Sequence, residues 1–299
     1  MRQFISFAEP DKDGILEITG KDFKYLHSVL RLKSGDMLSV RLPDGSLQNT
    51  TVCRLNAEKR VMTLQICADT QNKSVTRGVQ AAFVQSETAC NAVEFWLLQY
   101  IAKPVKMEQI IRQATECGVA KIIPIAGEYS QKQNVLAMSG AKKERVERIV
   151  REARQQSGSA VETDVCGPCS TKEALSLWKT ACMAGYDGSK RDSFVTAANA
   201  TSSADGENAQ NFKIGENVAL VLWERNERTR RLTDVLSKNV RRVAIAVGCE
   251  GGISPAEIEQ LEKDGFAPIH FAGNILRCET AALYGIAAVQ SMLGEMGDL

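Results

Sequence analysis

The first 70 or so residues alternate short apolar runs with turn signals. The runs occupy residues 15–18, 37–42, 51–55 and 61–66. Ser34-Gly35-Asp36 and Pro43-Asp44-Gly45 separate them, and these residue types favour tight turns between strands. One stretch, residues 21–30, instead carries apolar residues at helical spacing. Several short strands with one helix predict a small β-barrel, which we place at residues 1–72.

The pattern changes after residue 79, where short apolar strands alternate with amphipathic helices. The expected strands are 79–84, 121–125, 180–186, 218–223, 243–247 and 268–271. The expected helices are 105–117, 139–156, 171–178, 255–264 and 280–293. This alternation predicts an α/β domain with a mostly parallel sheet, at residues 76–299. Ligands of such sheets bind beyond the carboxyl ends of the strands.

Three further segments complete the organisation of the chain. The polar stretch 68–78 has the composition of a linker between domains. Residues 187–217 are rich in Ser, Ala, Asn, Gly and Asp, which predicts a long flexible surface insertion. Phe95, Trp96 and Tyr100 precede two lysines and could stack on bases, but a helix facing the core is the interpretation that we favour.

Composition narrows the function classes. The 299 residues are 44% apolar and 24% charged, as in folded soluble proteins. No run approaches the ~18 apolar residues of a membrane helix, and the N-terminus lacks signal-peptide features, so we expect a cytoplasmic protein without membrane association. A net charge of +1 excludes a uniformly basic polyelectrolyte binder. Nine cysteines at irregular spacing suit reduced thiols better than a disulfide framework.

The strongest chemical signal is a glycine-rich turn after the expected strand 243–247. Gly248-Cys249-Glu250-Gly251-Gly252 leads to a helix with Ser254 as N-cap, Pro255 at its first position and Glu257 three residues after the cap. Glycines between a strand and a helix let the backbone approach a ligand closely. The segment therefore indicates a nucleotide-like pocket, or a tight turn that needs glycine for structural reasons alone.

A second glycine turn follows the next strand. After Gly273-Asn274, Arg277 and Glu279 stand at the start of a helix rich in small residues. A salt bridge that caps this helix is the structural alternative. A charged pair beside glycine turns in two consecutive strand–helix units favours a functional site.

These residues resemble a known family. GCEGGIS, followed after one helix and strand by GNILRCETA, is similar to the signature of the ribosomal RNA small subunit methyltransferase E family. Supporting similarities are KMEQIIRQATECGVAKIIPI, KKERVERIVREARQQSG and HSVLRLKSGD, so the resemblance covers essentially the whole chain. Cys249 stands where the family usually has proline, and Cys278 where it has threonine. Gln113, Cys117 and Tyr129 also depart from the family pattern.

The resemblance implies a fold and an activity. The family has a PUA-like barrel followed by a SPOUT domain with a trefoil knot, and it forms homodimers. Its members use S-adenosylmethionine to methylate N3 of a uridine in 16S ribosomal RNA, free or within the small ribosomal subunit. Because they stand beside the glycine turns, we hypothesise that Arg277 stabilises charge that develops on the base and that Glu279 either orients Arg277 or accepts the proton. The candidate cofactor-binding residues are Leu222, Trp223, Glu224, Gly248, Glu250, Gly251, Gly252, Ile253, Ile275, Leu276 and Thr280.

RNA binding requires local basic surface even though the whole chain is nearly neutral. Residues 103–154 contain 11 basic and 6 acidic residues, and residues 223–242 contain 7 and 3. Solvated helix faces are the alternative explanation for both runs. The candidate RNA-binding residues are Arg31, Lys106, Arg230 and Arg231.

Other motifs in the chain could indicate other functions. Cys166-Gly167-Pro168-Cys169 has redox-motif spacing, but the surrounding pattern is not that of thioredoxin. Two distant histidines without a second cysteine pair argue against zinc, and we expect His27 to pack in the barrel. Two alternative functions stay open. The protein could be a non-catalytic RNA-binding or ribosome-assembly factor, or an enzyme that binds the phosphates of a nucleotide. Neither G-x-G-x-x-G nor a P-loop is present.

Overall fold

The computed structural model describes residues 3–67, 93–139, 143–184, 216–225, 229–271 and 273–297. The chain divides into two compact units. The first comprises Met1–Phe83 and Val150–Ala160, and the second comprises Val84–Ile149 and Val161–Leu299. The boundary expected between residues 72 and 76, the strand expected at 79–84 and nearly all of the insertion expected at 187–217 lie outside the described residues.

The first unit is a five-stranded sheet wrapped around one apolar core. Its elements are β1 (Phe4–Ile5), β2 (Ile15–Ile18), α1 (Gly20–Lys24), η1 (Tyr25–Val29), β3 (Met37–Arg41), β4 (Leu47–Asn56) and β5 (Val61–Ile66). The strand order is β1-β3-β4-β5-β2, so the described part is a half-barrel. Phe4, Phe23, Leu26 and Met62 are among the side chains that fill its core. The β-rich unit expected from the sequence is confirmed.

The helix expected at 21–30 is present but changes type along its length. After α1 the chain forms η1, a π-helix, in which the Leu30 amide donates to the Tyr25 carbonyl at 3.0 Å. His27 lies in this turn and stacks on Phe23, with ring centroids 5.2 Å apart, as expected of a packing histidine. Arg31 follows with φ of 58°, a left-handed conformation that side chains rarely adopt. These irregular geometries fall on the HSVLRLKSGD motif.

The second unit is a parallel six-stranded sheet. Its strands are β6 (Glu94–Tyr100), β7 (Lys121–Ile125), β8 (Asp164–Val165), β9 (Asn217–Leu222), β10 (Arg242–Val247) and β11 (Ala267–Ile269). Their order is β11-β9-β10-β6-β7-β8, and every pairing is parallel. Every residue of β10 is buried, because a parallel strand with helices on both faces has no solvent side.

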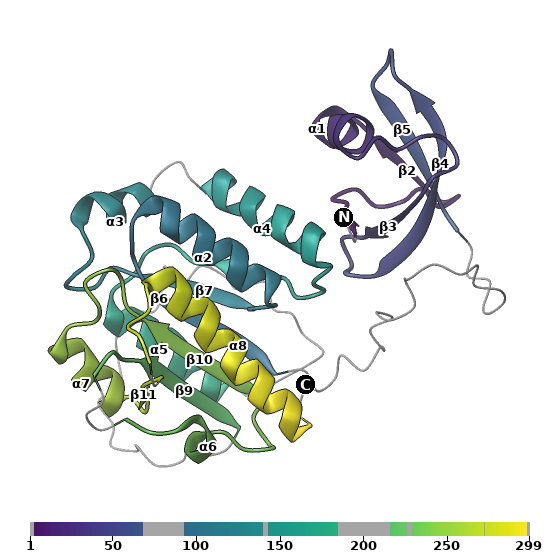
Figure 1. Cartoon of the computed structure of the whole chain (residues 1–299). Coiled ribbons are helices and arrows are strands. Elements are labelled where there is room, and N and C mark those ends of the chain that lie inside the picture. The colour runs from purple at the N-terminus through teal and green to yellow at the C-terminus, as the bar shows by residue number, and fades with distance from the viewer. Residues whose placement is uncertain are drawn as a thin grey trace. The chain divides into compact units, whose positions relative to one another are not determined.

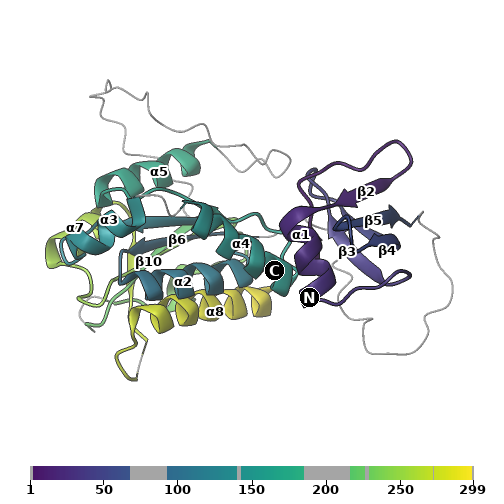
Figure 2. The same cartoon turned by 90° about the horizontal axis from the view of Figure 1, so that it is seen from above.

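Helices cover both faces of this sheet (Figure 1). The helices of this unit are α2 (Pro104–Glu116), α3 (Lys132–Ser139), α5 (Thr171–Met183), α6 (Leu232–Val235), α7 (Pro255–Lys263) and α8 (Cys278–Met296). A further helix, α4 (Lys143–Ser157), begins in this unit, and its residues from Val150 onward belong to the first unit. Figure 2 shows α2 and α8 along one face and α5 and α7 along the other. The Gln290 amide of α8 donates to the Cys117 carbonyl after α2 at 2.7 Å. Lys179 of α5 pairs with Asp264, the C-cap of α7, at 2.5 Å.

The interpretation of residues 95–100 as a helix is wrong. They form β6, which pairs with β7 and β10 in the middle of the sheet. Phe95, Trp96 and Tyr100 are each less than 5% exposed, so they are core residues and do not stack on bases. A continuous apolar run does not by itself distinguish a buried strand from a buried helix. The short length of this run favours a strand.

The strand expected at 180–186 is also wrong. α5 continues through this region to Met183. Ser170 and Glu173 form a capping box at its start, and Ala174, Leu175, Trp178 and Ala181 are buried at helical spacing. Trp178 lies between Trp96 and Phe266, with centroid distances of 5.6 and 6.4 Å. This packing stabilises the last turns of α5.

Candidate functional site

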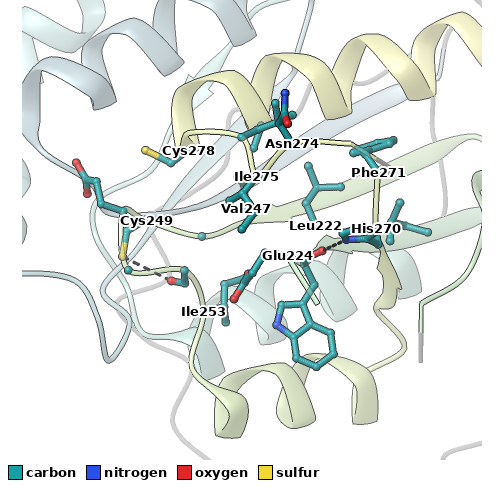
Figure 3. Close-up of a pocket in the computed structure, with 18 residues that line it drawn as sticks. Leu222, Glu224, Val247, Cys249, Ile253, His270, Phe271, Asn274, Ile275 and Cys278 are labelled. Atoms are coloured by element: carbon teal, nitrogen blue, oxygen red, sulfur yellow. Dashed lines mark hydrogen bonds between the residues drawn. The ribbon is translucent and has the colours of Figure 1, made fainter. Parts of the chain in front are cut away.

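A cavity opens where β9, β10 and β11 end. Leu222, Val247 and Ile269, the last residues of these strands, form its floor. The two glycine-bearing turns and the start of α8 complete the wall around a volume of about 250 Å³ (Figure 3). Parallel α/β sheets place their ligands at this edge, so the fold and the cavity agree.

The first wall is the turn from Gly248 to Gly252. The Gly252 amide donates to the Cys249 carbonyl at 3.0 Å, which closes the turn tightly. A Cβ atom at Gly248 would lie 2.8 Å from the carbonyl carbon of Gly252, so no other residue fits there without moving backbone. Gly252 has φ of 79°, a conformation that also favours glycine. Ser254 and Glu257 then form the expected capping box of α7.

A buried glutamine anchors this turn to the sheet. The Gln99 side chain, on β6, is fully buried. Its Nε2 donates to the carbonyl oxygens of Val247 and Gly248 at 3.2 and 3.1 Å. The amide therefore holds the end of β10, where the turn begins.

The second wall runs from Asn274 to Cys278. Asn274, Ile275, Leu276 and Cys278 line the cavity, and Ile275 is 80% exposed. Arg277 is the N-cap residue of α8 and is exposed. It lies between two lining residues, at the rim of the cavity. Figure 3 shows Cys249 and Cys278 at one end of the cavity and His270 and Phe271 at the other.

Strand ends on the other side of the cavity are joined by polar contacts. The Trp223 amide donates to the Ile269 carbonyl at 3.0 Å, which extends the pairing of β9 with β11. Nδ1 of His270 lies 3.2 Å from the Trp223 carbonyl oxygen. Gly285 of α8 meets Leu222 closely, since a Cβ there would lie 2.6 Å from Leu222 Cδ1. Small residues in α8 thus let the helix approach the cavity floor.

An ionic cluster joins the two walls. Lys106 Nζ, from α2, lies 2.9 Å from Glu279 Oε2 and 3.8 Å from Glu250 Oε1. The Cys278 thiol donates to the same Glu279 oxygen at 3.2 Å. Burial alone would raise the pKa of Glu279, but hydrogen bonds from its own amide, Lys106 and Cys278 outweigh burial and lower it. Glu279 is therefore a carboxylate at neutral pH.

Most of the candidate cofactor-binding residues meet at this cavity. Thr280, exposed on α8, is the exception among them. The lining members of the set are Leu222, Trp223, Glu224, Gly248, Glu250, Gly251, Gly252, Ile253, Ile275 and Leu276. Arg277 and Glu279 flank Cys278 at the rim, and Glu279 pairs with Lys106. Among the described residues, no hydrogen bond or ion pair joins Glu279 to Arg277.

Several lining residues were absent from the candidate set. Val247, Ile269, His270 and Phe271 lie at strand ends, and Ala281 lies in the first turn of α8. The carboxyl-end rule would have found the strand residues, because each sits where an expected strand stops. Ala281 carries no chemical signal in the sequence. Cys249, Asn274 and Cys278 also line the cavity, and they belong to the two motifs that the sequence singled out.

The candidate RNA-binding residues occupy different environments. Arg31 lies in the first unit, and Arg230 and Arg231 are exposed before α6 in the second. Arg231 pairs with Asp234 at 3.0 Å, although its side chain stays 82% exposed. Lys106 differs, because its ammonium group faces two carboxylates at the cavity.

The competing motifs show no matching chemistry. Burial raises the pKa of both Cys166 and Cys169, the latter to about 12, which disfavours the thiolate that redox motifs require. Both are free thiols. Within the described ranges, no group of three or more His, Cys, Asp or Glu residues could hold a metal ion. No helix in the described ranges is both long and apolar enough to cross a membrane.

Similar proteins of known structure share this architecture. Ribosomal RNA small subunit methyltransferase E from Neisseria gonorrhoeae, solved with S-adenosyl methionine, superposes with a TM-score of 0.67 at 21% identity, covering 98% of both chains. A methyltransferase from Legionella pneumophila, also solved with this cofactor, gives a TM-score of 0.66 at 19% identity and 97% coverage of both. This likeness shows the fold, a parallel α/β unit with a separate β-rich unit.

Sequence comparisons identify the family. Ribosomal RNA small subunit methyltransferase E of Buchnera aphidicola subsp. Schizaphis graminum is 28% identical over 198 residues, which are 66% of this chain and 65% of that protein. Its counterpart in Bacillus subtilis is 22% identical over 274 residues, covering 91% and 88%. The RNA methyltransferase domain profile matches residues 89–290, which include the whole cavity. The chain therefore belongs to the RNA methyltransferase family.

Proposed function

We propose that this protein transfers a methyl group from S-adenosylmethionine to N3 of a uridine in 16S ribosomal RNA. One observation carries the proposal: two glycine-bearing turns enclose a cavity at the strand ends, with an exposed arginine at its rim. Two sequence relatives are named ribosomal RNA small subunit methyltransferase E, and two proteins with this fold were solved with S-adenosyl methionine. Family membership supports the reaction class, and the cavity supports the donor.

The cavity suits an adenosine-bearing cofactor. Its floor is apolar, formed by Leu222, Val247 and Ile269, which suits the faces of an adenine ring. Glycines leave the backbone accessible at Gly248 and Gly252, positions that a Cβ would obstruct or strain. The Glu224 carboxylate lies 3.5 Å from the Cβ position of Gly252, a suitable acceptor for ribose hydroxyls. We propose that these residues, with Ile253, Leu276 and the other lining members, hold the cofactor.

The reaction sets two tasks for the chain. The bound cofactor supplies an electrophilic methyl group, and the uracil N3–H must lose its proton as the N3–methyl bond forms. We propose that Arg277 donates hydrogen bonds to a uracil carbonyl oxygen beside N3, where negative charge develops. Arg277 is the N-cap residue of α8 and lies in the chain between the lining residues Leu276 and Cys278, which places its backbone beside the cavity.

Glu279 suits positioning better than proton transfer. A general base works best when its pKa lies near the working pH. The pKa of Glu279 is lowered, and its Oε2 accepts from Lys106 and Cys278. We propose that Glu279 fixes the first turn of α8 and thereby the cap residue Arg277.

RNA must present an unpaired or flipped uracil, since N3 lies on the Watson–Crick edge. We propose that Arg31 in the first unit and Arg230 and Arg231 in the second contact phosphates. The left-handed Arg31 follows a π-helical turn, and such irregular backbone is frequent at functional sites. The substrate is the 16S RNA, free or in the small subunit.

Features of the chain's organisation, assembly and location accompany the proposal. The resemblance to the family supports a trefoil knot in the second unit and a homodimer. We also place the domain boundary between residues 72 and 76, with Thr280 near the cofactor through its position in the first turn of α8. A cytoplasmic location fits a ribosomal substrate and the eight free thiols of the described residues.

Mass mapping of ribosomal RNA tests the proposal. Cells lacking the protein should lose one 3-methyluridine from 16S RNA, and the wild-type gene should restore it. A gene encoding Arg277→Ala should not. An unchanged 16S methylation pattern in the deletion strain would contradict the assigned substrate. A restored mark with Arg277→Ala would contradict the role of that residue, and it would leave the substrate assignment intact.

A further inference from the structure

Lys106 occupies a position that neither RNA binding nor the cavity lining explains. It lies on α2, two residues after the first residue of that helix, and its side chain is 24% exposed. A lysine that contacts phosphate must have its ammonium group available to the phosphate oxygens. The ammonium group of Lys106 instead faces carboxylates from both cavity walls. The arrangement therefore calls for a role other than phosphate contact.

The contacts reach two segments that are distant in sequence. Glu250 belongs to the turn after β10, and its Oε1 lies 3.8 Å from Lys106 Nζ. The same oxygen accepts the Lys103 amide at 3.2 Å. Glu279 belongs to the first turn of α8, and its Oε2 lies 2.9 Å from Lys106 Nζ. The beginning of α2 thus holds the Gly248–Gly252 turn and the start of α8 together.

The two segments are held by different elements elsewhere. Gln99 fixes the beginning of the first turn at Gly248, while α8 packs along α2. Among the described residues, the Lys106 ammonium group contacts a side chain from each of these two turns. Cys278, which lines the cavity, donates to Glu279 and lies 3.9 Å from Lys106 Nζ. Lys106 therefore directly contacts a residue of the cavity wall, and replacing it should affect that wall.

We infer that Lys106 is a positioning residue that holds the two cavity walls in register for the cofactor, through Glu250 and Glu279. This inference rests on the proposed function for the identity of the cofactor. It reassigns Lys106, which the sequence suggested as an RNA contact. The mechanical part, a clamp between two turns, concerns the protein alone and is measurable without cofactor.

The first experiment uses hydrogen exchange of the full chain without ligand. In Lys106→Met, amides of residues 248–253 and of residues 278–282 should both exchange at least several-fold faster than in the wild type, because both turns lose one shared restraint. Lys179→Met is the matched control, since it removes an ammonium group from a lysine–carboxylate pair between α5 and α7. It should leave both segments unchanged. Unchanged exchange of either segment in Lys106→Met would overturn the clamp.

The second experiment separates positioning from RNA contact. Lys106→Met should raise the dissociation constant of S-adenosylmethionine about tenfold, a size typical of a partly screened ion pair plus lost pre-organisation. The RNA dissociation constant and its salt dependence should stay within twofold. Weaker RNA binding with a shallower salt dependence and unchanged cofactor affinity would make Lys106 a phosphate contact and overturn the inference.

Two further variants protect the test against simple misfolding. Lys106→Arg keeps the charge and should recover most of the cofactor affinity. Glu279→Gln should weaken the cofactor as Lys106→Met does, and the double variant should be little worse than either single one, since the residues act as a unit. Fully additive losses would overturn the inference. If the wild type binds no S-adenosylmethionine, the proposed function fails, while the exchange result still decides the clamp.

Discussion

Single residues at the cavity have separable tasks. Arg277 brings a permanent cation to the rim, and Gly248 gives the backbone room to fold tightly against Gly252. Cys249 and Cys278 are weakly ionised thiols, and burial raises the pKa of Cys278 to about 12. The site therefore combines exposed charged residues, Arg277, Glu224 and Glu250, with a backbone cradle and thiols that stay protonated.

Replacing Arg277 with alanine should reduce catalysis and spare cofactor binding. Loss of one donor to developing negative charge typically costs about 100-fold or more in kcat. Single-turnover methylation of 16S RNA and calorimetry with S-adenosylmethionine measure the two quantities. The cofactor dissociation constant should change less than twofold, and Arg277→Lys should retain part of the rate. Wild-type turnover in Arg277→Ala would remove this residue from the mechanism.

Gly248→Ala should damage the cofactor site directly. The new Cβ would lie 2.8 Å from backbone of Gly252, so the turn must open. We expect the free energy of unfolding to fall by about 1–3 kcal/mol, as for other overpacked sites, and cofactor affinity to fall at least tenfold. Gly167→Ala is a matched control, since nothing lies within 4 Å of its Cβ position. Equal behaviour of the two variants would argue against a tight cradle.

Thiol labelling checks the electrostatics of the cysteines. Because burial raises the pKa of Cys169 and Cys278 to about 12, almost no thiolate forms at pH 8. Iodoacetamide should label the exposed Cys53 first, with Cys169 and Cys278 at least 100-fold slower, as mass spectrometry of tryptic peptides can follow. Rapid labelling at Cys166 and Cys169 would instead revive a redox role for that pair.

At the scale of elements, strand ends and helix starts create the site. The sequence located β10, α7 and α8 closely, because a buried strand, a capping box and a small-residue helix are local signals. It misassigned residues 95–100 and 180–186, where local pattern is ambiguous. The apolar β6 is identified by its neighbours β7 and β10, and the end of α5 by Trp96 and Phe266 packed around Trp178. Tertiary contacts of this kind join residues that are far apart in the chain, so a short stretch of sequence does not reveal them.

The segment before α6 provides the clearest test of RNA binding. Arg230 and Arg231 are exposed, and the pair of Arg231 with Asp234 is an i,i+3 surface contact that competes weakly with phosphate. Arg230→Glu with Arg231→Glu should weaken RNA binding by tenfold or more at 50 mM salt and make its salt dependence shallower. Lys172→Glu with Lys263→Glu, at exposed positions of α5 and α7, makes the same change in net charge and is the control. Equal effects of both changes would assign the two arginines to solvent.

The whole molecule combines a β-rich half-barrel and a parallel α/β unit in one chain. Sequence alone predicted this division, because strand-turn repeats and strand–helix alternation differ along the chain. The candidate cofactor residues also converge on one cavity, with Thr280 as the exception. The role of Lys106 was not predictable, since its partners Glu250 and Glu279 are 144 and 173 positions away in sequence. Counting charges in the sequence shows that Lys106 lies in a basic run. The fold is needed to show which side chains face its ammonium group.

The central claim concerns the cavity between the two glycine-bearing turns, and its most direct test is a calorimetric titration of the full chain with S-adenosylmethionine. We predict saturable binding with one site per chain and a micromolar dissociation constant, weakened at least tenfold by Gly248→Ala and within twofold of the wild type in Gly167→Ala. No heat of binding to the folded wild-type protein, or binding that Gly248→Ala leaves unchanged, would contradict the account.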